Sequence, residues 1–155
     1  MIWNEALEQY VSDHQDEVVE LIRTLVAIPA FSNHEQARAE FCAKWFRDVG
    51  AEDVKIDEAS NVIVTLGDVQ AGKAVAFMAH LDTVFPDETG FELVEEDGWL
   101  KARGTTLGAD DGVGVAMMLA LLEADQKPHP PLECVFTVME EIGLNGAQGL
   151  KKDYF

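Results

Sequence analysis

The sequence is short of several kinds of residue, and each shortage excludes a class of protein. Only two of its 155 residues are cysteines, too few for the disulfide framework of a small secreted domain. Cys42 falls in a helical pattern and Cys134 in a strand pattern, so we expect two buried free thiols. Five prolines and 12 glycines are too few for a fibrous or low-complexity chain. The sequence therefore predicts a globular protein.

Basic residues and long apolar runs are scarce as well. Lysine and arginine number 11 against 29 aspartates and glutamates, which gives a formal charge of -18. Such a charge repels phosphate, so we expect neither nucleic acid nor an anionic membrane as a partner. No segment approaches the roughly 18 apolar residues of a membrane span, and the N-terminus lacks the pattern of a secretion signal. We therefore expect a cytoplasmic location.

Apolar residues make up 48% of the chain and recur with the spacing of helices in some segments and of strands in others. Helices are predicted over residues 4–28, 34–49 and 112–124. Strands are predicted over residues 54–56, 61–66, 74–79 and 132–138, and an exposed hairpin over 91–95 and 99–102. Because helices and strands alternate, the fold class is α/β, with a mainly parallel sheet and helices on both faces.

Two of these segments are apolar on every side. Residues 74–79 are apolar on both faces of the predicted strand, which is typical of a strand in the middle of a covered sheet. Residues 112–124 are apolar almost all round, which indicates a buried helix. The sequence stops soon after strand 132–138, without a further helix to cover that edge, and an uncovered edge would favour self-association.

Three polar clusters interrupt the apolar pattern, at residues 80–82, 110–111 and 140–141. The first and third follow predicted buried strands, and the second precedes a predicted helix. In open α/β sheets, the carboxyl ends of parallel strands border the crevice in which ligands bind. We therefore expect the first and third clusters to lie on the same rim of the sheet.

The first two clusters each have a structural and a functional interpretation. A neutral imidazole at His80 could bind a metal, with Asp82 accepting the other ring N–H, or the pair could be a core histidine followed by a turn. One aspartate of Asp110 and Asp111 could cap the helix that begins at Gly112. Capping needs only one carboxylate, so the other is free to bridge two cations.

The third cluster is a pair of adjacent glutamates. In a continuing strand Glu140 and Glu141 would point to opposite faces, so both can serve one centre only if the strand has ended. The glycines at 143 and 146 supply that break. One glutamate could then bind a metal while the other transfers a proton. The structural alternative is an exposed acidic turn.

Taken together, one imidazole and two separate carboxylates at the ends of elements form a ligand set that suits zinc or a similar divalent ion. A metal lowers the pKa of bound water from 15.7 to about 7, and a second one can hold the carbonyl oxygen of an amide. The set therefore predicts a hydrolase. No nucleophile motif, phosphate-binding glycine loop or zinc-finger spacing in the sequence competes with this interpretation.

Three motifs carry a resemblance to a known family. They are Met78-Ala-His-Leu-Asp-Thr-Val-Phe-Pro86, Gly104-Thr-Thr-Leu-Gly-Ala-Asp-Asp-Gly-Val-Gly114 and Val135-Phe-Thr-Val-Met-Glu-Glu-Ile-Gly143. In order and spacing they resemble the co-catalytic zinc exopeptidases, which include tripeptidase T, aminoacyl-histidine dipeptidase and the glutamate carboxypeptidases. The likeness implies a three-layer fold and hydrolysis of small peptides, and it is strongest for the tripeptidase and dipeptidase branch.

The resemblance also implies a role for each site residue. His80 would bind one metal ion and Glu141 the other, Asp110 would bridge the two, Asp82 would orient His80, and Glu140 would be the general base. The cofactors would be two divalent ions, zinc or alternatively manganese or cobalt. The peptide bond that follows the bridging aspartate would be cis.

The sequence departs from the family at two points. Gly112 stands where many relatives have lysine. No residue matches the further carboxylate, the last histidine or the lid or dimerisation domain of relatives. We therefore expect residues 1–155 to be the N-terminal portion of a catalytic domain, with an incomplete site, weak or absent metal binding and little activity of its own.

Three hypotheses for the function follow. The first is a metal-dependent exopeptidase that cleaves small peptides through a metal-activated water. The second is an amidohydrolase of N-acyl amino acids, since deacylases of the family share these motifs. The third is a non-catalytic fragment that associates with itself, for instance as a homodimer.

Overall fold

The computed structural model describes residues 5–69, 73–84, 92–123 and 129–151. The helices and strands lie close to the predicted segments. They are α1 Glu5–Val26, α2 Gln36–Asp48, β1 Asp53–Ile56, β2 Val62–Leu66, β3 Val75–His80, β4 Leu93–Glu96, β5 Trp99–Ala102, α3 Ala109–Glu123, β6 Leu132–Thr137 and α4 Asn145–Gln148. The predicted start of the first helix at residue 4, the start of the hairpin at 91 and the end of the third helix at 124 lie outside the described residues.

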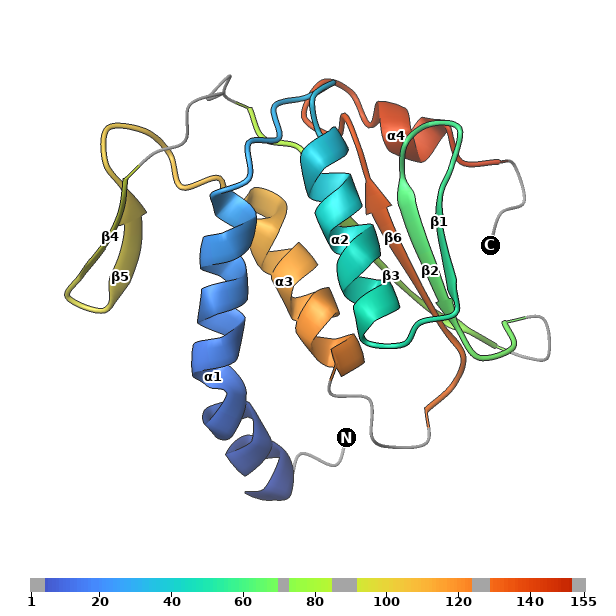
Figure 1. The fold of residues 1–155 in the computed structure, drawn as a ribbon, viewed down its shortest axis with the longest axis horizontal. Coiled ribbons are helices and arrows are strands. Elements are labelled where there is room, and N and C mark those ends of the chain that lie inside the picture. The colour runs from blue at the N-terminus through green and yellow to red at the C-terminus, as the bar shows by residue number, and fades with distance from the viewer. Residues whose placement is uncertain (1–4, 70–72, 85–91, 124–128, 152–155) are drawn as a thin grey trace.

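Four strands form one sheet in the order β1-β2-β6-β3 (Figure 1). β3 and β6 are parallel, whereas β1 with β2 and β2 with β6 are antiparallel. The α/β class is confirmed, and the sheet is mixed rather than mainly parallel. The reason is the length of the connections, because residues 57–61 between β1 and β2 can only reverse the chain. A parallel crossover takes about a dozen residues or more, and the segment containing α3 supplies one between β3 and β6.

Among the described strands, β2 and β6 lie inside this sheet, and β3 does not. All six residues of β6 are buried, whereas β3 forms an edge with Val75 and Met78 exposed. The prediction that residues 74–79 lie in the middle of the sheet was therefore wrong. Apolar side chains on both faces of a strand indicate what the strand packs against, and they do not fix its place in the strand order.

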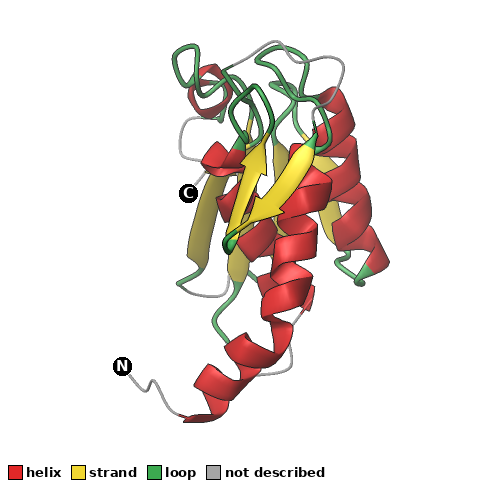
Figure 2. Ribbon diagram, turned by 90° about the vertical axis from the view of Figure 1, so that its left-hand side faces the viewer, coloured by secondary structure: helices red, strands yellow, loops and turns green. Residues whose placement is uncertain are grey.

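The helices α1, α2 and α3 lie together on one face of the sheet (Figures 1 and 2). Phe46 of α2 packs on Phe136 of β6 with ring centroids 5.3 Å apart, and Leu25 of α1 and Leu119 of α3 are fully buried beside them. Each such side chain stabilises the fold by roughly 2 to 3 kcal/mol through burial. Among the described residues, the second helical layer that we expected is not formed.

The predicted hairpin is present as β4 and β5, beside α1 in Figure 1. Asp97 and Gly98 both have positive φ at its turn, as an Asp-Gly pair favours. Arg23 of α1 pairs with Glu95 of β4, which ties the hairpin to the helix layer.

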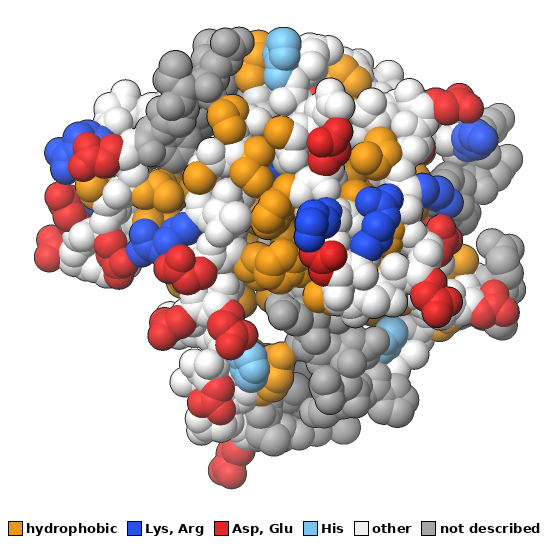
Figure 3. All heavy atoms as spheres, viewed as in Figure 1, with side chains coloured by type: hydrophobic (Ala, Val, Ile, Leu, Met, Phe, Trp, Pro, Cys, Tyr) orange, Lys and Arg blue, Asp and Glu red, His pale blue; other side chains and the backbone are white. Residues whose placement is uncertain are grey.

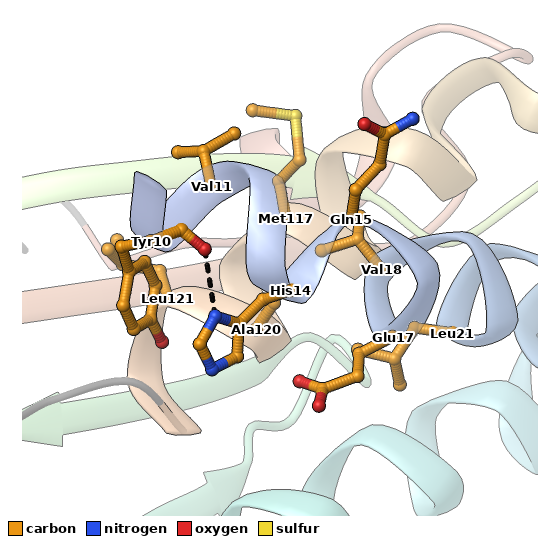
Figure 4. Close-up of a pocket in the computed structure, with 10 residues that line it drawn as sticks. All are labelled: Tyr10, Val11, His14, Gln15, Glu17, Val18, Leu21, Met117, Ala120 and Leu121. Atoms are coloured by element: carbon orange, nitrogen blue, oxygen red, sulfur yellow. Dashed lines mark hydrogen bonds between the residues drawn. The ribbon is translucent and has the colours of Figure 1, made fainter. Parts of the chain in front are cut away.

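The helix α3 is less buried than its composition predicts. Val113, Met117 and Leu121 repeat at helical spacing and are 37, 60 and 45% exposed. The last two line a groove of about 670 Å³ between α1 and α3 (Figure 4). Figure 3 shows apolar side chains gathered on this face among acidic ones.

Two sequence-based expectations about composition can be compared with the structure. Cys42 and Cys134 are buried free thiols, as predicted. Burial raises the pKa of each to about 12. Within the described ranges, no helix combines the length and apolar character that a membrane crossing requires.

Candidate metal centre

His80 is the last residue of β3 and presents one ring nitrogen to a cluster of carboxylates. Its Nδ1 lies 3.1 Å from the backbone oxygen of Asp82 and 3.5 Å from Asp82 Oδ1. A carbonyl oxygen only accepts hydrogen bonds, so Nδ1 carries a proton and donates it. Nε2 lies 3.1 Å from Asp110 Oδ1 and 3.9 Å from Glu140 Oε2. In the neutral ring, Nε2 is therefore the nitrogen with a lone pair for a cation.

Asp82 joins the end of β3 to the turn after β6. Its buried carboxylate accepts hydrogen bonds from the Ser32 hydroxyl at 2.6 Å and from the backbone N–H groups of Glu140 and Glu141 at 2.8 and 3.1 Å. The predicted contact between Asp82 and His80 is present. His80 Nδ1 lies closer to the backbone carbonyl oxygen of Asp82 than to its carboxylate. Asp82 thus fixes both the imidazole and the pair of glutamates.

The side chains of Asp110 and Asp111 make different contacts. Asp111 Oδ1 accepts the backbone N–H of Gly114 at 3.0 Å and so caps α3. Asp110 and Asp111 have non-helical backbone angles, and regular helix begins after them, at the predicted Gly112. The side chain of Asp110 is 86% exposed and faces His80. The peptide bond between Asp110 and Asp111 is cis, as the resemblance implied.

The two glutamates follow the end of the strand, as the sequence required. β6 ends at Thr137, and Met139 turns the chain with a φ of 53°. One carboxylate oxygen of Glu141 belongs to a group with His80 and Asp110 in which the donor atoms all lie within 4.8 Å of one another. The three segments that the sequence singles out therefore meet at one rim of the sheet.

The charges at this rim favour a cation. Burial alone would lower the pKa of His80, but hydrogen bonds to Asp82 and Asp110 and the charges of Asp82 and Glu140 raise it to about 9. Burial would raise the pKa of Asp82, but the hydrogen bonds that it accepts lower it to about 2. Burial and the neighbouring carboxylates raise the pKa of Glu141. The carboxylates of the cluster thus favour a positive charge at this rim.

The donor set fits a divalent ion. Ligand atoms around a tetrahedral zinc ion lie about 3.4 Å apart, given metal–ligand bonds of about 2.0 to 2.1 Å. The atoms of His80, Asp110 and Glu141 lie within 4.8 Å of one another, so adjustments of about an ångström bring them to that spacing. An imidazole with two carboxylates suits zinc, and the same donors accept manganese or cobalt. Among the described residues this is the only such group.

Three residues near the site escaped the sequence analysis: Ser32, Glu35 and Asn61. All are buried, and each hydrogen-bonds to Asp82 or to the backbone of residues 138 and 139. Ser32 and Glu35 have the Ser-x-x-Glu spacing of a helix capping box, the one signal that could have drawn attention to them. In the structure Glu35 makes no side-chain cap and turns towards the site instead.

The fold is similar to that of exopeptidases with known structures. A tripeptidase from Staphylococcus aureus subsp. aureus Mu50 is 31% identical, with a TM-score of 0.79 over 89% of this chain and 40% of that one. The aminoacylhistidine dipeptidase of Vibrio alginolyticus is 31% identical, with a TM-score of 0.76 over 89% of this chain and 30% of that one. In sequence, the cytosol non-specific dipeptidase of Escherichia coli (strain K12) is 36% identical over 87% of this chain and 30% of its own length.

The chain belongs to peptidase family M20/M25/M40, whose family model matches residues 76–154. The matched segment contains all five residues that the sequence analysis assigned to the site. The family is metal-dependent, and the group formed by His80, Asp110 and Glu141 is where this chain could hold a metal ion. The chain spans 30 to 40% of the length of the three relatives described above.

Proposed function

We propose that this chain is the N-terminal portion of the catalytic domain of a cytoplasmic, metal-dependent exopeptidase that hydrolyses small peptides. The observation that carries the proposal is the convergence of His80, Asp110 and Glu141 on one point, with Glu140 beside them. The names of the relatives, which are a tripeptidase and two dipeptidases, support small peptides as the substrate class.

The proposed cofactors are two divalent ions, zinc in the first place. Nε2 of His80 would hold one ion and Glu141 the other, with the exposed carboxylate of Asp110 between them. When bound, the ions supply Lewis-acid chemistry, which lowers the pKa of water to about 7 and polarises the carbonyl of the scissile amide. The described part of the chain offers three such donors, so we expect it to bind divalent ions weakly.

The proton transfers fall to the residues of the chain. Glu140 Oε2 lies 3.9 Å from His80 Nε2, and we assign it the role of general base, which takes a proton from the attacking water and passes it to the leaving amine. Asp82 keeps the proton of His80 on Nδ1, so that Nε2 stays directed at the metal position.

Calorimetric titration with zinc chloride tests the metal centre. The wild-type chain is expected to show weak but saturable binding, which His80→Ala abolishes. His34→Ala is the matched control, because His34 is exposed and stacks on Phe31. Equal binding by wild type and His80→Ala would overturn the assignment. A chain that binds no zinc but sediments as a stable dimer would favour the non-catalytic, self-associating alternative.

Hydrolysis of dipeptides and tripeptides in the presence of zinc, manganese or cobalt tests the reaction. Glu140→Gln is expected to remove hydrolysis and to keep metal binding, whereas Glu52→Gln, which changes an exposed glutamate in the connection before β1, is expected to keep both. Hydrolysis retained in Glu140→Gln refutes the assigned base. A parallel panel of N-acyl amino acids separates a peptidase from a deacylase.

A further inference from the structure

Directly after β6, the backbone of residues 138–141 forms hydrogen bonds with side chains instead of with a neighbouring strand. Four successive backbone N–H groups donate to buried side-chain oxygens. These bonds are Val138 to Asn61 Oδ1 at 3.2 Å, Met139 to Glu35 Oε1 at 2.9 Å, Glu140 to Asp82 Oδ1 at 2.8 Å and Glu141 to Asp82 Oδ2 at 3.1 Å. The last two donors belong to the carboxylate pair of the candidate site.

The three acceptors come from different parts of the chain and are all buried. Asn61 and Asp82 are 0% exposed and Glu35 is 5% exposed. A buried carboxylate without hydrogen-bond donors is unfavourable, so these side chains and the amides satisfy each other. The arrangement allows Met139 to adopt its φ of 53° directly before the glutamate pair.

Glu35 is not one of the three candidate metal ligands, and its hydrogen bond to Met139 calls for another explanation. It immediately precedes α2 and accepts the amide of Met139, one residue before Glu140. The same end of α2 is fixed to the chain just after β3, because the buried guanidinium of Arg38 donates to the carbonyl oxygen of Leu81 at 2.8 Å. Glu35 therefore connects the start of α2, which is fixed near Asp82, to the turn that carries Glu140 and Glu141.

We infer that Glu35 is a positioning residue for the carboxylate pair. Its hydrogen bond to Met139 sets the backbone from which Glu140 and Glu141 project, and thereby the distance of their oxygens from His80. The consequence for metal binding rests on the proposed function, whereas the hydrogen bond and its effect on the backbone do not.

Two variants and a control test this inference in the 155-residue chain. Glu35→Ala removes the acceptor, and Glu35→Gln keeps an acceptor oxygen without the charge. Glu40→Ala is the matched control, because Glu40 lies in the first turns of α2, the helix that Glu35 precedes, is exposed and contacts Gln36. Amide hydrogen exchange without metal reports on the turn, and zinc titration below the melting temperatures of all variants reports on the site.

Glu35→Ala is expected to speed exchange at Met139, Glu140 and Glu141 about ten-fold, the equivalent of one hydrogen bond to a charged acceptor, with Val135 of β6 unchanged. Zinc affinity is expected to fall about ten-fold as well. Glu35→Gln should raise the exchange rate at Met139 only about two- to three-fold and restore most of the affinity, since neutral acceptors form weaker bonds. Glu40→Ala should match the wild type.

A merely structural role for Glu35 predicts a different pattern. It would lower the melting temperature, leave the zinc affinity of the folded protein unchanged and speed exchange equally at Met139 and Val135, and that result overturns the inference. If Glu35→Ala does not fold, Glu35→Gln decides alone through the selective rise at Met139. A wild type that binds no zinc refutes the proposed metal centre, and the exchange measurement then still decides whether Glu35 positions the turn.

Discussion

Replacing Asp82 by asparagine tests the hydrogen-bond centre on which the candidate site is built. The side chain is fully buried and accepts three hydrogen bonds, from the Ser32 hydroxyl and from the amides of Glu140 and Glu141. Asparagine has nearly the same shape but carries an NH₂ group in place of one oxygen. Whichever way the amide is turned, that group faces a donor, and at least one buried N–H group loses its acceptor.

The magnitude follows from the number of bonds lost. A buried donor left without a partner costs about 1 to 3 kcal/mol, and bonds to a charged acceptor lie in the upper half of that range. With one or two donors affected, we expect Asp82→Asn to lower the free energy of unfolding at pH 7 by about 2 to 4 kcal/mol.

The loss of unfolding free energy in Asp82→Asn should also depend on pH, because the Asp82 carboxyl titrates. The pKa of Asp82 is lowered from 3.8 to about 2, because its hydrogen bonds favour the charged form in the folded state. Its contribution is therefore fully present above pH 4 and is lost as the pH falls through 2. By linkage it amounts to about 2 kcal/mol, so the difference between wild type and Asp82→Asn should shrink by about that amount in acid.

Urea unfolding followed by circular dichroism at pH 7, 5, 3 and 2, with a chelator present, measures both quantities. Asp48→Asn is the control, since Asp48 is exposed and pairs only with Lys44 in the described hydrogen bonds and ion pairs, and it should cost about 0.5 kcal/mol or less. A difference for Asp82→Asn below 1 kcal/mol at pH 7, or one that stays constant down to pH 2, contradicts the reasoning.

Three further predictions concern the core and the turn. Phe136→Ala removes a fully buried ring, and it should lower the free energy of unfolding by about 3 to 5 kcal/mol in urea titrations. Gly146→Ala places a Cβ 2.3 Å from the carbonyl oxygen of Val138, and it should cost about 1 to 3 kcal/mol in the same assay, with intact secondary structure. Cys42 and Cys134 should react with a thiol reagent at pH 8 only once urea unfolds the chain, because burial raises the pKa of both to about 12, and rapid labelling of the folded protein would contradict this.

The periodicity of the sequence predicts the elements better than their arrangement. The spacing of apolar residues locates α1, α2 and β6 because each element buries one face or both, and burial follows the local repeat. The order of strands depends on which distant segments pair, which no local repeat encodes. For that reason the sequence pattern wrongly placed β3 inside the sheet, whereas the structure has it at the edge.

The same contrast applies to the site. The convergence of His80 with the glutamate pair could be predicted because they lie at the ends of apolar strands, and the ends of β3 and β6 are level in a parallel register in which His80 stands opposite Thr137. The hydrogen bond of Glu35 could not be predicted, since its partner Met139 is 104 residues away in the sequence. The role of a polar residue inside a protein depends on such a partner, and the residue type alone leaves it open.

The parallel pairing of β3 with β6 also bears on the order of events during folding. Asp82 and Glu140 are 58 residues apart in the sequence, and they meet only after the crossover through α3 has closed. Closing so large a loop is among the slower steps, because its entropy is lost before the contacts form. A divalent ion at this rim would therefore arrive after the chain has folded, and it would slow unfolding rather than guide the early collapse.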